Sequence, residues 1–183
     1  DINSQKAAAH SSIKQIDSLQ EIITPAAVGN VGKFVRGVDS FIDQAFALTD
    51  IAGMDLSAFR RKTRGVVGKN LPETSAVIQS RVVDLAYSMA KAKDDGRLSD
   101  QDVARFREQL GESGSVPQFM AVLDDMKDRV RSQASGEIEA LTGVKPIDLM
   151  TIDELGTAID EVQDADILRA IIKEQERRRG KRK

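Results

Sequence analysis

Cysteine is absent from this 183-residue chain, histidine occurs only at His10, and aromatic residues make up 4% of the sequence. Without cysteine the chain cannot form disulfides, thiolate zinc sites, iron–sulfur clusters or cysteine nucleophiles. A single histidine argues against a histidine metal site or a Ser-His-Asp triad within one chain. No apolar run approaches the length of about 18 residues that spans a bilayer, so we expect no membrane-spanning segment.

The chain begins Asp1-Ile2-Asn3 and lacks an initiator methionine. Its start also lacks the basic, apolar and small-residue succession of a secretory signal. We therefore expect the C-terminal portion of a longer polypeptide, with a processed protein as the alternative.

Charge is distributed unevenly along the chain, although the formal net charge is only −2. Residues 1–93 hold 12 basic and 9 acidic residues, residues 94–173 hold 9 and 18, and residues 174–183 hold 6 and 2. An acidic body between two basic segments indicates partners of opposite charge or contacts between copies of the chain. Simple solvation of the acidic surface is the alternative for the middle segment.

Apolar residues recur at helical spacing almost everywhere, and no segment shows the strict alternation that is typical of strands. The sequence therefore predicts an all-α protein, an irregular bundle of about seven helices. Gly96, Gly111, Gly136 and Gly143 are interpreted as stops or turns between them. The expected helices cover residues 10–23, 30–49, 73–94, 100–110, 116–133, 151–161 and 165–179.

The predicted organisation has four segments. Residues 1–49 form long N-terminal helices, residues 50–72 a basic linker or loop, residues 73–150 a compact helical module, and residues 151–183 C-terminal helices with a basic tail. The strongest amphipathic pattern lies in the first segment and predicts a face that packs on another helix or chain. We interpret it as an assembly face formed by Val31, Phe34, Val38, Phe41, Ile42 and Phe46.

Helix starts are signalled by capping residues. Ser99, Ser115 and Thr151 each precede an acidic or amide residue by three positions, and Asp164 is a further candidate cap. The segment around Gly96 is similar in spacing to an EF-hand loop, but that alignment places Lys91 and Lys93 where oxygen ligands are required. We expect a structural turn there and no calcium site.

Two basic clusters are candidates for contact with a partner or with nucleic acid, because lysine and arginine neutralise phosphates. Neither cluster contains the aromatic residues that stack on single-stranded bases. A solvated tail, or pairing of the loop with the acidic segment of the same or a neighbouring chain, is the alternative. The candidates are Arg60, Arg61, Lys62, Arg64 and Lys69 in the loop, and Arg177, Arg178, Arg179, Lys181, Arg182 and Lys183 in the tail.

Catalytic constellations are missing from the sequence. Carboxylates such as those of Asp124, Asp125 and Asp128 lie on the polar sides of the expected helices, where solvation is the default, and not as a pair across a pocket. There is no glycine-rich phosphate loop and no metal-ligand spacing. We expect no enzyme activity, no cofactor, no metal and no small-molecule substrate.

A pattern between Leu71 and Arg131 resembles a helical module of large virion proteins of tailed bacteriophages. It consists of Leu85-Ala86-Tyr87 in a helix, the turn Gly96-Arg97-Leu98-Ser99-Asp100, a short helix, a break at Gly114-Ser115 and a longer helix with Phe119. The resemblance covers about a third of the chain and carries no catalytic residues.

What the resemblance implies is an internal, ejection, portal-associated or tail-associated protein of the phage particle, made in the host cytoplasm. Such a protein acts through helix-mediated assembly with copies of itself and other virion proteins, and packaged DNA is a further candidate partner. The alternative is a nucleic-acid-associated packaging or regulatory protein that uses the basic loop and tail.

Overall fold

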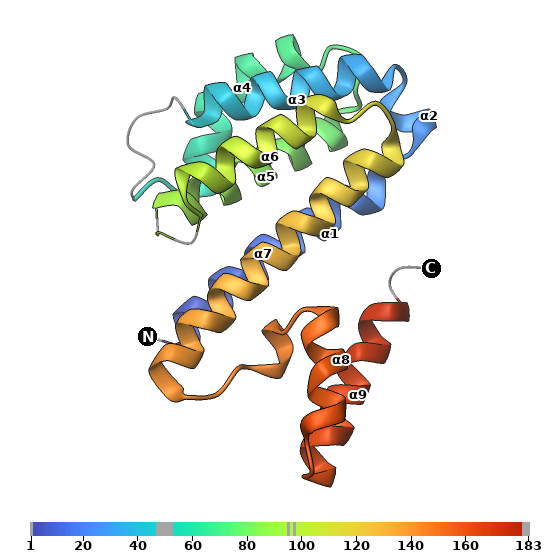
Figure 1. Ribbon diagram of the computed structural model, residues 1–183. Coiled ribbons are helices and arrows are strands. Elements are labelled where there is room, and N and C mark those ends of the chain that lie inside the picture. Colours follow the sequence, from blue (N-terminus) through green and yellow to red (C-terminus); the bar gives the residue numbers. More distant parts are fainter. Residues whose placement is uncertain (1, 47–52, 95, 97, 181–183) are drawn as a thin grey trace. The chain divides into compact units, whose positions relative to one another are not determined.

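The computed structural model describes residues 2–46, 53–94, 96 and 98–180. These residues form nine α-helices and one 3₁₀ helix and contain no strand, which confirms the all-α class and exceeds the expected count of about seven helices (Figure 1). The elements are α1 (Ile2–Ile22), α2 (Pro25–Val28), α3 (Val31–Phe46), α4 (Leu56–Asn70), α5 (Ala76–Asp94), α6 (Asp100–Glu112), α7 (Val116–Thr142), η1 (Ile147–Leu149), α8 (Ile152–Glu161) and α9 (Ala165–Gly180).

The chain divides into two compact units. Unit 1 comprises residues 1–9 and 128–183, and unit 2 comprises residues 10–127. Helices α1 and α7 contribute residues to both units. These boundaries differ from those of the four predicted segments, because the first turns of α1 belong with the C-terminal helices and not with α3.

Unit 2 is built around α3, which contacts α4, α5 and α6 (Figure 1). Its apolar stripe is fully covered: Val38, Phe41 and Ile42 are each 0% exposed. The rings of Phe34 and of Phe119 on α7 pack in a T-shaped arrangement, with ring centroids 5.4 Å apart. Burial of such side chains supplies most of the free energy that holds a helical unit together.

The expected basic loop is instead largely the helix α4. Asp55 caps its N-terminus by accepting a hydrogen bond from the Ala58 backbone N–H at 2.6 Å. Phe59 is buried and its ring lies 5.4 Å from that of Tyr87 on α5. The loop prediction was wrong for this stretch because Gly65 and Gly68 lower its helix propensity, while tertiary packing of one face compensates.

Glycine was an unreliable marker of helix ends. Gly96 and Gly143 have φ angles of 73° and 74° and terminate helices as expected. Gly111 and Gly136, by contrast, lie inside α6 and α7. Helix α7 continues past Gly136 because Ala134 and Ile138 extend its buried face by one more turn.

The predicted caps are present. Ser99 and Thr151 each form a reciprocal capping box, with Asp102 and Glu154 respectively. Asp164 accepts from the backbone N–H of Asp166 at 2.9 Å and from that of Ile167 at 3.1 Å. These side chains satisfy amide groups that the first helical turn leaves without partners.

In unit 1, η1 and α8 each pack on α9 (Figure 1). Leu149, Leu155 and Ile171, one from each element, are at most 1% exposed and form the apolar contact. Because this apolar contact is small, polar contacts such as that of Arg178 with the Asp148 carbonyl oxygen also position α9.

Helices α3 and α4 approach each other closely at Gly37. A β-carbon at this position would lie 1.9 Å from the backbone carbonyl oxygen of Asn70, a distance that requires the backbone to move. Next to this contact, the Ser40 hydroxyl donates to Asn70 Oδ1 at 3.1 Å. At Gly68 on α4, by contrast, no atom lies within 4 Å of the place that a β-carbon would take.

The two glycines are therefore expected to respond oppositely to alanine. Gly37→Ala should lower the free energy of unfolding by about 1–3 kcal/mol, because it overpacks the α3–α4 contact. Gly68→Ala should raise it by about 0.5–1 kcal/mol, because alanine loses less backbone entropy in an exposed helix. Urea titrations followed by circular dichroism measure both; equal effects of the two changes would contradict the close approach of α3 to α4.

Candidate functional site

The basic residues predicted between positions 60 and 69 all lie on α4, which contains no acidic residue. Arg60 differs from the others because its guanidinium pairs with a carboxylate of α5. Its Nε donates to Asp84 Oδ1 on α5 at 3.0 Å. The Asp84 side chain is only 5% exposed and that of Arg60 is 45% exposed, so Arg60 neutralises a buried carboxylate from the surface of unit 2.

Arg61, Lys62, Arg64 and Lys69 are exposed, and none of them makes an ion pair with a residue that the structure describes. We call these four residues the α4 basic surface. At 3.6 residues per turn they fall within an arc of about 160° around the helix, opposite the buried Phe59, Thr63 and Val67. The predicted pairing of this cluster with the acidic segment 94–173 is not seen among the described residues.

Gly65 and Gly68 lie in the middle of the α4 basic surface, between its arginines and lysines on the helical wheel. Nothing lies within 4 Å of the position that a side chain would take at either glycine. Packing within the chain therefore does not require glycine at positions 65 and 68, although each glycine destabilises the helix. The result is a low strip of backbone flanked by four cationic side chains.

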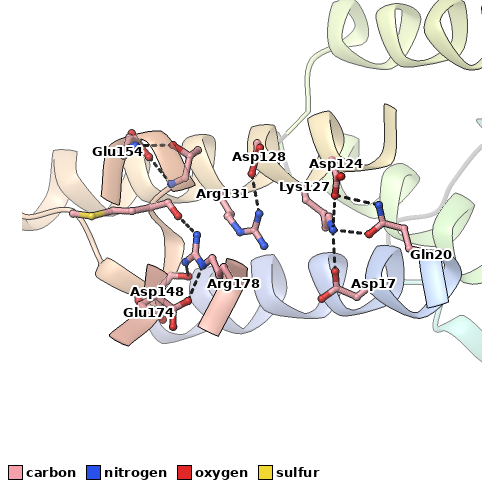
Figure 2. A network of polar contacts seen from close by, with 12 residues as sticks. Asp17, Gln20, Asp124, Lys127, Asp128, Arg131, Asp148, Glu154, Glu174 and Arg178 are labelled. Atoms are coloured by element: carbon pink, nitrogen blue, oxygen red, sulfur yellow. Dashed lines mark hydrogen bonds and ion pairs between the residues drawn. The ribbon is translucent and has the colours of Figure 1, made fainter. Parts of the chain in front are cut away.

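The C-terminal basic cluster is largely occupied by contacts within unit 1. Arg178 is 6% exposed, and its guanidinium donates to the backbone carbonyl oxygens of Met150 and Asp148, the latter at 2.8 Å (Figure 2). Its Nε donates to Glu174 Oε1 at 2.7 Å. The prediction of Arg178 as a partner contact was therefore wrong, since it holds η1 against α9.

The neighbours of Arg178 differ in their surroundings. Arg177 is bound to the same carboxylate, with its Nε donating to Glu174 Oε2 at 2.7 Å. Arg179 is exposed. The predicted contacts Lys181, Arg182 and Lys183 lie outside the described residues.

Glu174 is the acidic centre of this arrangement. Burial raises its pKa, but hydrogen bonds from Arg177 and Arg178 and their positive charges outweigh burial and hold the pKa below its ordinary value. Lys145 similarly holds the pKa of Glu154 low against the effect of burial, through a hydrogen bond of 2.8 Å. The fold of unit 1 therefore favours the ionised form of both Glu174 and Glu154.

The predicted assembly face is part of the core of unit 2. Phe34, Val38, Phe41 and Ile42 are at most 4% exposed within the single chain, and Val31 packs partly buried beside them. Of the two partners that the sequence allowed for this face, another helix or another chain, the structure shows helices of the same chain, because α4, α5 and α6 contact α3. The side chain of Phe46 lies outside the described part.

A polar network in unit 2 was not found from the sequence. Lys127 on α7 donates to Asp17 Oδ1 on α1 at 3.1 Å and to Gln20 Oε1 at 2.5 Å, and pairs with Asp124 at 2.8 Å (Figure 2). Its side chain is 12% exposed. The sequence could indicate only the pair of Asp124 and Lys127, which are three residues apart. Asp17 and Gln20 reach Lys127 through tertiary packing of α1 on α7.

The part of the chain that the structure describes indicates neither a metal centre nor a membrane-spanning helix. Among the described residues, no group of three histidine, aspartate or glutamate side chains is arranged to hold a metal ion. In that same part of the chain, no helix combines the length and apolarity needed to cross a bilayer. The predicted turn has Gly96 with a φ angle of 73°, and Ser99, which follows it, caps α6. Asp95 and Arg97 lie outside the described residues.

No protein-family model, curated protein or solved structure matches this chain. The α4 basic surface is consequently the candidate site on physical grounds alone, because four exposed cationic side chains gather on a helix that has no acidic residue.

The lowered pKa of Glu174 predicts a loss of stability in acid. A carboxyl whose pKa is lower in the folded than in the unfolded chain stabilises fully above the unfolded value, about 4.3, and loses this effect as the pH falls through the folded value. Glu174→Gln should therefore flatten the decrease in unfolding free energy between about pH 6 and pH 3. Glu176→Gln, an exposed change on the same helix, is the control. Identical pH profiles for wild type and Glu174→Gln would contradict the assignment.

Proposed function

We propose that this chain is a structural component of a tailed-bacteriophage particle, either an internal or ejection protein or a portal- or tail-associated one. It is made in the host cytoplasm and incorporated into the virion, among copies of itself and other virion proteins. Its role is structural and not enzymatic.

The location of the residues that resemble the virion module supports this role. Most of the stretch that carries the resemblance, residues 71–127, lies within unit 2, and several of its residues build that unit: Leu85, Leu98 and Phe119 are at most 3% exposed, and Ser99 caps α6. The similarity therefore concerns how a helical unit folds, as expected for a module whose job is packing and not chemistry.

The α4 basic surface is the observation that carries the proposal. Unit 2 contains 15 basic and 16 acidic residues, yet α4 holds five basic residues and none acidic. With the α3 stripe buried, this charged surface is the means of attachment to other particle components. Charge complementarity of this kind sets orientation and encounter rate more than binding strength.

The alternative role is a nucleic-acid-associated packaging or regulatory protein, which would use the same surface of α4. Support from the C-terminal cluster is reduced, because Arg178 is buried and Arg177 is bound to Glu174. A regulatory protein would act in the infected cell, whereas a structural protein stays with the particle.

Particle composition separates these roles. Mass spectrometry of purified, nuclease-treated phage particles should find peptides of this chain together with the capsid and tail proteins. Peptides that occur only in the soluble fraction of the infected cell would contradict the structural role.

Charge reversal tests the means of attachment. The triple change Arg61→Glu, Lys62→Glu and Arg64→Glu should reduce incorporation into particles while leaving the melting temperature nearly unchanged, since exposed substitutions shift stability little. The control reverses three exposed basic residues elsewhere in unit 2: Lys14, Arg36 and Arg105. Equal incorporation of both variants would show that α4 is not the attachment surface.

A further inference from the structure

The α4 basic surface has a composition that narrows the choice of partner. The exposed residues of α4 are serine, glycine, arginine and lysine, and none of them is apolar. Gly65 and Gly68 leave a low strip between the cationic side chains, with open space above both. A partner that lies along this strip therefore meets positive charge and bare backbone.

We propose that the α4 basic surface binds the sugar–phosphate backbone of duplex DNA. This inference rests on the proposed function, in which α4 contacts another component of the particle, and names that component by its chemistry. Phosphates need only positive charge and close approach, and arginine and lysine supply the charge. The glycines allow the backbone of the duplex to approach the helix.

The dimensions agree with contact to several phosphates. Arg61 and Lys69 are eight residues apart along the helix, which corresponds to a distance of about 12 Å along its axis. Duplex DNA carries one charge per about 1.7 Å of its axis, so several phosphates lie within reach of four side chains on that length.

Protein and membrane partners fit this surface less well. The centre of a protein interface is usually enriched in aromatic and other apolar residues, and an interfacial membrane helix inserts apolar side chains into the lipid. The exposed side of α4 offers neither kind of residue. Of its apolar residues, Phe59 and Val67 are buried in unit 2, and Leu56, Ala58 and Val66 are half-buried.

Duplex is favoured over single-stranded DNA for a related reason. Single-strand binding relies on aromatic side chains on which bases stack. The one aromatic residue of α4, Phe59, packs against Tyr87 of α5, and the Tyr87 hydroxyl donates to the Met54 carbonyl oxygen at 2.8 Å. They are not available for stacking.

Binding is also expected to be nearly independent of sequence. The amide of Asn70, the only asparagine or glutamine on α4, donates to the Val66 carbonyl oxygen at 2.9 Å and its oxygen accepts from Ser40. It cannot read an adenine edge while it makes these bonds. The net charge of the chain is −2, so any affinity for DNA must come from a local surface and not from overall charge.

Fluorescence anisotropy of the full chain with a labelled duplex of about 30 base pairs tests the inference, since that length exceeds the roughly 22 Å of α4 several times. We expect the logarithm of affinity to fall with the logarithm of salt concentration with a slope of about −3.6, as four neutralised phosphates predict. Duplexes of different sequence should bind within about threefold of one another, which is below the discrimination of a single base contact.

Matched variants locate the contact. Changing Arg61, Lys62 and Arg64 to glutamine should abolish most of the binding, whereas the same change at Lys14, Arg36 and Arg105 should retain it. The single change Arg64→Gln should make the slope shallower by about 0.9. Circular dichroism establishes whether each variant is folded. If the triple variant does not fold, the single variant still tests the inference.

Three results would overturn the inference: no binding by the wild-type chain at low salt, equal losses in the α4 and control variants, or a preference for single-stranded DNA. Binding to anionic vesicles through α4, without binding to DNA, would assign the surface to a membrane instead. If the chain is found in particles but does not bind DNA, only the DNA contact is wrong. If it binds DNA but is absent from particles, the structural role is wrong and the DNA contact stands.

Discussion

The apolar stripe of α3 is the constraint on which unit 2 depends. Val38, Phe41 and Ile42 are completely buried, and α4, α5 and α6 all contact the helix that carries them. A stripe of this size cannot remain in water, so a chain must cover it either from within or with a second copy. Here the chain covers it from within. The stripe is therefore not a surface on which another molecule can bind.

The same packing decides which side of α4 faces outward. Phe59 packs on Tyr87, Arg60 is held by the buried carboxylate of Asp84, and Gly37 lets the end of α4 approach α3 closely. With these contacts made, the rotation of α4 about its axis is determined, and its remaining basic residues point away from the core. A cluster of charge that adds nothing to the packing of unit 2 is thus displayed as a consequence of the core, and its proposed use is contact with the particle and its DNA.

The local code of the sequence predicted much of this fold. Helical spacing predicted the class, and the caps at Ser99 and Thr151 were visible as short motifs because capping depends on neighbouring residues. Features that depend on distant residues were not predictable. The helix α4 is stabilised by α5, the role of Arg178 requires the carbonyl groups of η1, and Lys127 finds partners about a hundred residues away. The sequence indicated the two basic clusters. It did not indicate that Arg60 pairs with Asp84 or that Arg178 binds the carbonyl groups beside η1.

Hydrogen exchange of the full chain, measured by mass spectrometry at low and at high protein concentration, tests most directly whether the α3 stripe is an internal core. Amides in α3 should exchange slowly and at the same rate at both concentrations, because the protecting contacts lie within one chain. Protection of α3 that appears only at high concentration would show that a second copy covers the stripe, and would contradict the account.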